Sequence, residues 1–134
     1  MAGYSGTPLV KKLGIKAGMK ISVVGAPEEF WKELGEMPEV KATEKPTKEM
    51  DFILFFSDSK KMFEKHFSKF RDALSTSGML WISWPKKASK IATDLNENII
   101  RNFGLANGLV DVKVCAVTDK WSGLKFVYRL KDRV

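Results

Sequence analysis

Asp51-Phe52-Ile53-Leu54-Phe55-Phe56 forms an almost uninterrupted apolar run near the middle of the chain. A run this short is typical of a β-strand covered on both faces, because a strand with one solvated face alternates apolar and polar residues. Such strands occur in parallel sheets that lie between two layers of helices. The run therefore predicts an α/β fold in which residues 51–56 form a buried strand.

The segments on either side of this run alternate between strand and helix patterns. Further strands are predicted over residues 19–24, 40–43, 79–84, 110–117 and 124–130. Helices are predicted over residues 8–14, 27–35, 60–77 and 95–107. Gly78 is expected to end the third helix, and a capping box of Asp94 and Glu97 to begin the fourth. Residues 86–93 are expected to form a loop, and residues 119–123 a hairpin turn.

This order of elements predicts a three-layer, Rossmann-like α/β sandwich. The sheet is expected to contain about five to six strands, mainly parallel, with one antiparallel strand supplied by the C-terminal hairpin. The 134 residues suit one domain, whose residues 1–14 form an N-terminal arm and a short helix.

The composition excludes several classes of protein. Hydrophobic residues make up 44% of the chain and charged residues 29%, which are values of globular rather than disordered proteins. A single cysteine and a single histidine exclude an internal disulfide and a zinc site of the usual Cys/His type. No metal site is expected. Without an apolar run of membrane-spanning length or a signal-peptide core, we expect a cytoplasmic protein with no membrane partner.

The charge is positive overall and unevenly distributed. The net charge is +7, and residues 60–90 carry eight basic residues against two acidic ones. Residues 28–49 carry a net charge of −3. The basic segment indicates either an anionic partner or a solvated basic helix.

The alternation of strands and helices with a final hairpin resembles the class I methyltransferase fold. Residues 78–83 resemble the fifth strand of that fold, and residues 51–54 resemble the fourth. The resemblance implies that this chain lacks about one strand–helix unit in its middle. It covers residues 15–130 and concerns topology, so it implies a fold and not an activity.

Six short motifs resemble a bacterial family, domain-of-unknown-function family 3052. They are Tyr4-Ser5-Gly6-Thr7-Pro8, Lys11-Lys12-Leu13-Gly14, Ser83-Trp84-Pro85-Lys86-Lys87, Thr93-Asp94-Leu95, Gly108-Leu109-Val110-Asp111 and Trp121-Ser122-Gly123-Leu124-Lys125. The resemblance covers nearly the whole chain, and it implies no particular activity.

The methyltransferase resemblance directs attention to the loop after the first strand. In that fold the loop is rich in glycine, whereas here only Gly25 remains and Pro27 removes an amide donor. Glu28 and Glu29 place negative charge where the cofactor's carboxylate favours a positive potential. Glu44 follows the second strand, where an acid would hold ribose hydroxyls. Gly25 and Glu44 are the candidate S-adenosylmethionine residues, but no bound cofactor is expected.

The carboxyl ends of the parallel strands are the expected place for a ligand. Four segments follow strands predicted to end at this rim: 25–28, 57–59, 84–93 and 119–123. The third segment combines a tryptophan, a proline turn and lysines, which suits a small anion or a nucleotide with a stacked ring. The candidate ligand-binding residues are Trp84, Pro85, Lys86, Lys87, Ser89, Lys90, Ser57, Asp58, Trp121 and Ser122.

Each of these residues also has a structural interpretation. The lysines would be solvated at a proline turn, and Trp84 and Trp121 would fill the core, as Trp81 is expected to do. Lys60 and Lys61 oppose the dipole of the third helix, an effect that either residues 57–59 or an anion bound between Lys60 and Lys86 would offset.

The remaining candidates favour structural roles. Residues 4–8, with Lys11 and Lys12 nearby, are expected to pack as an arm over the sheet. His66 is expected at the edge of a buried helix face, and Cys115 as a small buried side chain. Asp58 and Asp119 fall at the rim, but a single pair of carboxylates does not define a metal site.

These observations favour a non-catalytic protein that binds a small anionic or nucleotide-like ligand at the rim. A divergent S-adenosylmethionine-dependent methyltransferase is the enzymatic alternative. Nucleic-acid binding through residues 60–90 is a third hypothesis, although the sequence contains no recognition-helix motif. An accessory domain that docks a protein partner is the fourth.

Overall fold

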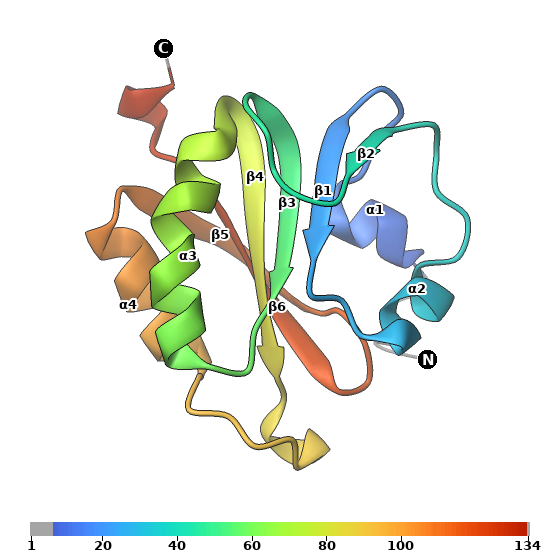
Figure 1. Ribbon diagram of the computed structural model, residues 1–134, viewed down its shortest axis with the longest axis vertical. Helices are drawn as coiled ribbons and strands as arrows, with labels where there is room; N and C mark the ends of the chain where they lie inside the picture. Colours follow the sequence, from blue (N-terminus) through green and yellow to red (C-terminus); the bar gives the residue numbers. More distant parts are fainter. Residues whose placement is uncertain (1–6, 134) are drawn as a thin grey trace.

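The computed structural model describes residues 7–133, which contain one six-stranded sheet (Figure 1). The strands are β1 (Lys20–Val24), β2 (Lys41–Thr43), β3 (Met50–Phe56), β4 (Leu74–Pro85), β5 (Leu109–Ala116) and β6 (Trp121–Tyr128). Their order across the sheet is β2-β1-β3-β4-β6-β5. The first four strands in chain order are parallel, and β6 is antiparallel to both β4 and β5.

Helices cover both faces of the sheet. The helices are α1 (Leu9–Leu13), α2 (Glu28–Leu34), α3 (Lys60–Ala73) and α4 (Glu97–Ala106), and two short 3₁₀ turns are η1 (Lys87–Ser89) and η2 (Leu130–Asp132). Helices α1 and α2 pack on one face and α3 and α4 on the other, which confirms the predicted three-layer class. Within residues 7–133, no helix combines the length and apolar character that crossing a membrane requires.

Strand β3 lies inside the sheet and is buried on both faces. Ile53 and Phe55 belong to the core beneath α3 and α4. Phe52, Leu54 and Phe56 belong to the core beneath α1 and α2. This arrangement explains the apolar run, because successive side chains of a strand point to opposite faces and both faces are dry here.

The α1 end of the molecule is fixed to the sheet by one buried polar contact. The indole N–H of Trp81 donates to the carbonyl of Leu13 at 2.9 Å, and both side chains are fully buried. Gly14 ends α1 with a φ of 88°, a conformation that favours glycine. Trp81 is thus a core residue, as predicted. Residues 4–6 of the predicted arm lie outside the described residues.

The connection between β2 and β3 contains no helix. Residues 44–49 cross over β1 to reach the start of β3 (Figure 1). Strands β2 and β3 lie on opposite sides of β1, so a strand and its helices can be absent here without breaking the sheet. The predicted shortening of the methyltransferase-like fold falls at this connection.

The third helix ends earlier than the sequence predicts. Helix α3 stops at Ala73, and Leu74 is already extended and paired with Met50. Gly78 is therefore not a helix-ending residue. A Cβ atom at Gly78 would lie 2.5 Å from the carbonyl oxygen of Met50, so glycine is required there by close contact between β4 and β3.

The predicted capping box of the fourth helix is also wrong. Asn96 is the N-cap of α4, and its side-chain oxygen accepts from the amide of Ile99 at 2.9 Å. Asp94 instead accepts from the backbone amide of Lys60 at 2.7 Å, at the start of α3. The sequence pattern identified a capping residue correctly but assigned it to the wrong helix.

The C-terminal hairpin turns earlier than predicted. The backbone amides of Val117 and Thr118 donate to the carbonyl of Trp121, and the hydroxyl of Thr118 accepts from the amide of Lys120. The turn therefore closes over residues 117–120. Trp121 and Ser122, predicted in the turn, belong to β6, which ends at Tyr128 rather than at Leu130.

Candidate functional site

The carboxyl ends of β1, β3 and β4 meet at one edge of the sheet, at the bottom of Figure 1. The segments predicted to gather at this rim are present there. However, they line separate hollows rather than one site. Side chains that leave a strand on opposite faces enter different hollows, and this separates Trp84 from Trp121.

The first hollow, here called the β1–β3 hollow, has a volume of about 350 Å³. It brings together four candidate residues, namely Gly25, Ser57, Asp58 and Trp121. Phe55, Phe56 and Met62 complete its walls, so most of its lining is apolar. The ring of Trp121 meets Phe56 edge-on, with 5.4 Å between the ring centres. Ser57 is buried, and its hydroxyl donates to the carbonyl of Ser59 at 3.0 Å.

The second hollow, here called the loop hollow, has a volume of about 540 Å³. Four of the predicted ligand-binding residues line it: Trp84, Pro85, Lys87 and Lys90. Ile91, Ala92, Thr93, Leu95 and Asn96 form the rest of the lining. Lys87 and Lys90 are exposed, whereas only 7% of Trp84 is exposed. An aromatic wall and two ammonium groups therefore border the same space.

The loop that forms this second hollow is held by short-range hydrogen bonds. The hydroxyl of Ser89 donates to the carbonyl of Lys86 at 2.6 Å and accepts from the amide of Ile91. The hydroxyl of Thr93 donates to the carbonyl of Asp58 at 2.7 Å, which ties the loop to the end of β3. Ser89, predicted as a ligand-binding residue, therefore uses its hydroxyl to shape the loop.

Lys90 adopts an unusual backbone conformation at the mouth of the loop hollow. Its φ is 64°, a left-handed value that it shares with only one other non-glycine residue in the described chain, Glu49. A non-glycine residue held in this region costs about 1 kcal/mol or more, and such strain gathers at functional sites. The loop thus holds the Lys90 ammonium beside the hollow at an energetic cost.

Lys86 and Ser122, two further candidates, lie elsewhere. The backbone amide of Lys86 donates to the carbonyl of Lys120, and the carbonyl of Ser122 accepts from the hydroxyl of Ser83 at 2.8 Å. The Lys86 ammonium is close enough to Cys115 to lower the pKa of its thiol. Cys115 packs in the core beneath α1 and α2, so the charge of Lys86 lies apart from that of Lys87 and Lys90.

The start of α3 needs no bound anion. Asp94 accepts from the amide of Lys60, and the hydroxyl of Ser59 accepts from the amide of Met62 at 3.2 Å. Lys60 also pairs with Glu64, at 3.9 Å. These groups offset the unfavourable lysines of the first turn, so the hypothesis of an anion bound between Lys60 and Lys86 is unnecessary.

The loop after β1 is a poor fit for the carboxylate end of S-adenosylmethionine. Only residues 25–27 separate β1 from α2, whose N-cap position is Pro27 without a side-chain cap. Gly25 has a φ of 74°, and a Cβ there would lie 3.0 Å from the carbonyl oxygen of Phe56. The loop is therefore packed against the end of β3, with carboxylates rather than lysines in the first helical turn.

The position of Glu44 fits the ribose end of that cofactor better. Glu44 directly follows β2 and lines a hollow of about 230 Å³ with Val23, Trp31, Met37 and Thr43. Its backbone carbonyl accepts from the hydroxyl of Ser22 at 3.3 Å. Ile21 and Ala42 complete the lining. An acid beside an apolar, tryptophan-walled hollow at the end of β2 is one part of a nucleoside site.

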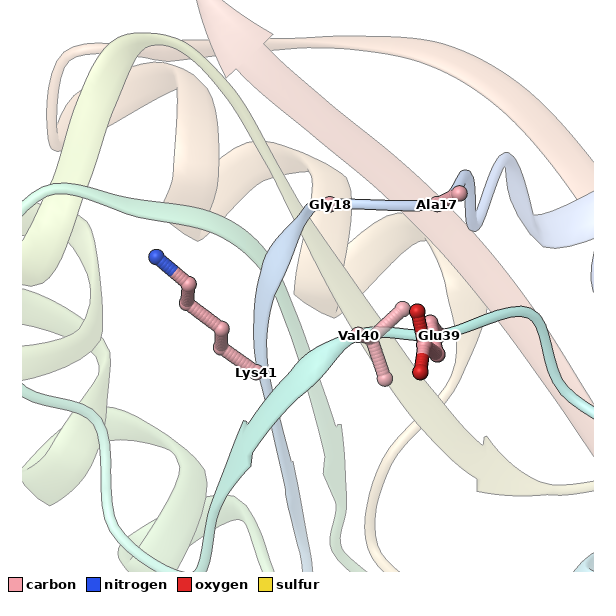
Figure 2. A pocket seen from close by; sticks show the side chains of 5 residues that line it. All are labelled: Ala17, Gly18, Glu39, Val40 and Lys41. Atoms are coloured by element: carbon pink, nitrogen blue, oxygen red, sulfur yellow. The ribbon is translucent and has the colours of Figure 1, made fainter.

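A further hollow, missed by the sequence analysis, lies at the opposite edge of the sheet. Its volume is about 330 Å³ and it is lined by Ala17, Gly18, Glu39, Val40 and Lys41 (Figure 2). Its backbone is held by a hydrogen bond of 2.7 Å from the amide of Gly18 to the carbonyl of Glu39. In Figure 2 the side chains of Glu39 and Lys41 point away from one another, so polar groups do not converge there.

The remaining reactive side chains occupy structural positions. His66 lies between the rings of Phe55 and Phe70, 5.9 Å from each, at the edge of the α3 interface. Burial raises the pKa of the Cys115 thiol, so the unreactive protonated form is favoured. Among residues 7–133, no three His, Cys, Asp or Glu side chains cluster as they would around a metal ion.

Solved structures similar to this chain are methyltransferases. A protein from Sulfolobus solfataricus assigned as a type 11 methyltransferase has a TM-score of 0.64 at 17% identity, over 92% of this chain and 91% of that one. A TehB-like SAM-dependent methyltransferase from Corynebacterium glutamicum has a TM-score of 0.57 at 10% identity, over 90% and 85%. At these identities the likeness establishes the fold alone.

A third similar structure was solved with a ligand. It is the magnesium protoporphyrin IX methyltransferase ChlM from Synechocystis PCC 6803 with bound SAH, with a TM-score of 0.57 at 11% identity, over 90% of this chain and 78% of that one. No protein-family model and no curated protein matches this chain.

Proposed function

We propose that this protein binds a small anionic or nucleotide-like ligand in the loop hollow and does not catalyse a reaction there. One observation supports this proposal above the others. Lys87, Lys90 and Trp84 border a hollow of about 540 Å³, and Lys90 is held there in a strained conformation. Two ammonium groups would attract a phosphate or carboxylate, and the buried tryptophan offers an apolar wall for a ring.

Two features support binding without catalysis. Within residues 7–133 the lining of the loop hollow includes no histidine, cysteine or carboxylate that could act as a general base or nucleophile. The hydroxyl of Thr93 is used to hold the loop to Asp58.

The test is a thermal-shift and calorimetry panel of inorganic phosphate, pyrophosphate, AMP, ATP and SAH. A ligand present at one hundred times its dissociation constant adds about 2.7 kcal/mol to the free energy of unfolding, which gives a measurable rise in melting temperature. The double variant Lys87→Gln and Lys90→Gln is expected to lose the response to the phosphate compounds.

The matched control is Lys65→Gln with Lys69→Gln, which removes two exposed lysines of α3. It carries the same change in net charge and is expected to keep the wild-type response. A response that survives in Lys87→Gln with Lys90→Gln, or is lost equally in the control, contradicts the proposal. Silence across the whole panel does so as well.

A second candidate function is that of a divergent S-adenosylmethionine-dependent methyltransferase. The fold shared with methyltransferases and the position of Glu44 at the end of β2 favour it. Glu44 and Gly25 would then face the ribose and the methionine part of the cofactor. The sulfonium group would supply the methyl group, and the apolar β1–β3 hollow would exclude water from it.

Calorimetry with SAH separates the two candidates. Binding that is lost in Glu44→Ala and kept in Lys87→Gln with Lys90→Gln supports the methyltransferase. No heat of binding for the wild-type protein with SAH excludes it. The closed loop around Gly25 leads us to expect that second result.

Membership of domain-of-unknown-function family 3052 and a cytoplasmic location belong to the same proposal. The first is supported by the six motifs quoted above, of which residues 4–6 lie outside the described part of the chain. The second is supported by Cys115, a free and half-buried thiol that suits a reducing compartment.

A further inference from the structure

Two lysines face each other across neighbouring strands near the edge of the sheet. Lys113 of β5 pairs directly with Lys125 of β6. Like charges in this position repel, so the pair is destabilising unless an anion lies close by. Burial lowers the pKa of Lys125, with smaller effects in the same direction from Lys113 and Lys16. Lys125 is thus a partly buried cation among other cations.

Helix α1 adds two more lysines to this face. The Lys113 ammonium donates to the carbonyl of Lys12 at 2.8 Å, and the Lys12 ammonium reaches the carbonyl of Ala116 at 3.4 Å. Lys16 follows α1 and acts on Lys125, as described above. The contacts bring α1 directly against the open face of β5 and β6.

A fifth lysine extends the group to the rim. Burial raises the pKa of Cys115, and the charges of Lys12, Lys113 and Lys86 lower it. Three ammonium groups therefore surround this thiol. Lys86 follows Pro85, which pairs with Trp121. We call the group the lysine stripe; its members are Lys12, Lys16, Lys86, Lys113 and Lys125.

No carboxylate of the described chain forms an ion pair with the stripe. The ion pairs found in residues 7–133 are Lys60 with Glu64, Arg71 with Asp72, and Arg101 with both Glu97 and Asp111. All of them involve α3, α4 or the α4 side of β5. The positive charge of the stripe is therefore uncompensated by the part of the protein that the structure describes, and it would suit an external anion.

We propose that the lysine stripe binds the sugar–phosphate backbone of single-stranded nucleic acid. Along β6, Lys125 and Trp121 are four residues apart, or about 13 Å, a length that spans two to four phosphates of one strand. A single phosphate would reach only part of the stripe. Lysine is a flexible point charge that contacts phosphates without reading bases.

Trp121 makes a single strand the better fit. It lies at the rim end of the stripe, on the same face as Cys115, and it is partly exposed. Proteins that bind single strands combine a basic track with aromatic side chains on which unpaired bases stack. A duplex, whose bases are already stacked on each other, would leave this tryptophan unused. The site is independent of the loop hollow and of its proposed ligand.

The experiment measures binding of a fluorescent 20-nucleotide single-stranded DNA by anisotropy over a series of salt concentrations. Each phosphate contact contributes about 0.7 to the slope of log K against log salt for a single strand. The variant Lys113→Gln with Lys125→Gln is expected to reduce that slope by about 1.4. At 0.1 M salt this corresponds to about 25-fold weaker binding.

Lys65→Gln with Lys69→Gln is the matched control and is expected to bind as the wild type does. Lys16→Gln is a second test variant, since its exposed side chain makes no hydrogen bond in the described structure, and it is expected to weaken binding about fivefold. It retains the fold even if the double variant does not. Trp121→Phe should keep the salt slope and weaken binding.

Three results would overturn the proposal. The first is oligonucleotide binding that is equal in the wild type, Lys113→Gln with Lys125→Gln, and Lys16→Gln. The second is an equal loss in the control variant, which would indicate an unspecific effect of net charge. The third is stripe-dependent binding to vesicles containing phosphatidylserine, or to inorganic phosphate alone, without binding to the oligonucleotide.

Discussion

At the scale of single residues, Lys90 combines a structural cost with a proposed role. Glycine adopts its left-handed conformation without strain. We therefore expect Lys90→Gly to raise the free energy of unfolding by about 0.5–1 kcal/mol, measured by urea denaturation, while it weakens phosphate binding. Lys87→Gly removes a similar charge within η1 without relieving strain, and it should not stabilise the protein. Equal stability changes in the two variants would contradict this account of Lys90.

Gly104 is fixed by a different constraint, the lack of space. A Cβ atom there would lie 2.1 Å from the ring of Phe126, which is fully buried and packs against Phe67. Gly104→Ala should gain about 1 kcal/mol of helix propensity but lose more through overpacking, for a net loss of about 1–2 kcal/mol in urea denaturation. Asn102→Ala, at an exposed position of the same helix, should not destabilise. A stabilised Gly104→Ala variant would show that α4 can move.

Lys125 predicts a pH dependence of stability. Burial lowers its pKa below the usual 10.5, so between the two values the unfolded chain binds more protons than the folded protein. Through this group the free energy of unfolding rises with pH in that window. Lys125→Met should therefore be more stable than the wild type at pH 7, by a margin that shrinks as the pH approaches 10.5.

Tyr128 acts in the opposite direction in the same experiment. Burial raises its pKa above 10.0, so stability through this group falls as the pH rises past that value. The difference between the wild type and Lys125→Met isolates the lysine, because both proteins contain the tyrosine. A margin that is constant from pH 7 to 10 would contradict the lowered pKa of Lys125.

At the scale of elements, Asp94 joins two helices that are distant in sequence. Its carboxylate accepts from the backbone amide of Lys60 and so caps α3 from the loop before α4. Asp94→Ala should cost about 1 kcal/mol in urea denaturation, because an amide loses its partner and the helix dipole loses a favourable charge. Asp94→Asn keeps an acceptor and should cost about half as much. No effect of Asp94→Ala would leave Ser59 as the sole cap.

The strands and helices were predicted best where one local pattern decides the structure. The apolar run at residues 51–56 and the glycine after Leu13 needed no knowledge of distant residues. The end of α3 depends on contact between Gly78 and Met50, which belong to different strands. The capping role of Asp94 likewise depends on Lys60, 34 positions away in the chain. Sequence periodicity cannot reveal such partners.

At the scale of the whole molecule, the fold class was predictable and the arrangement of the site was only partly so. Strand ends indicated the rim, because parallel strands share one carboxyl edge. The division into two hollows depends on which face of the sheet each side chain leaves, and Trp84 and Trp121 leave opposite faces. The lysine stripe was missed because its members come from four segments that are dispersed in the chain.

The two helical layers differ in length, and this difference has a kinetic consequence. Helices α1 and α2 contain five and seven residues, whereas α4 and α3 contain ten and fourteen. Helices as short as the first two persist only through their packing on the sheet. Amide protons of α1 should therefore exchange with deuterium through small local openings, while those of β3 and β4 await global unfolding. Each such opening would carry Lys12 away from Lys113 and would expose the indole of Trp81 to solvent.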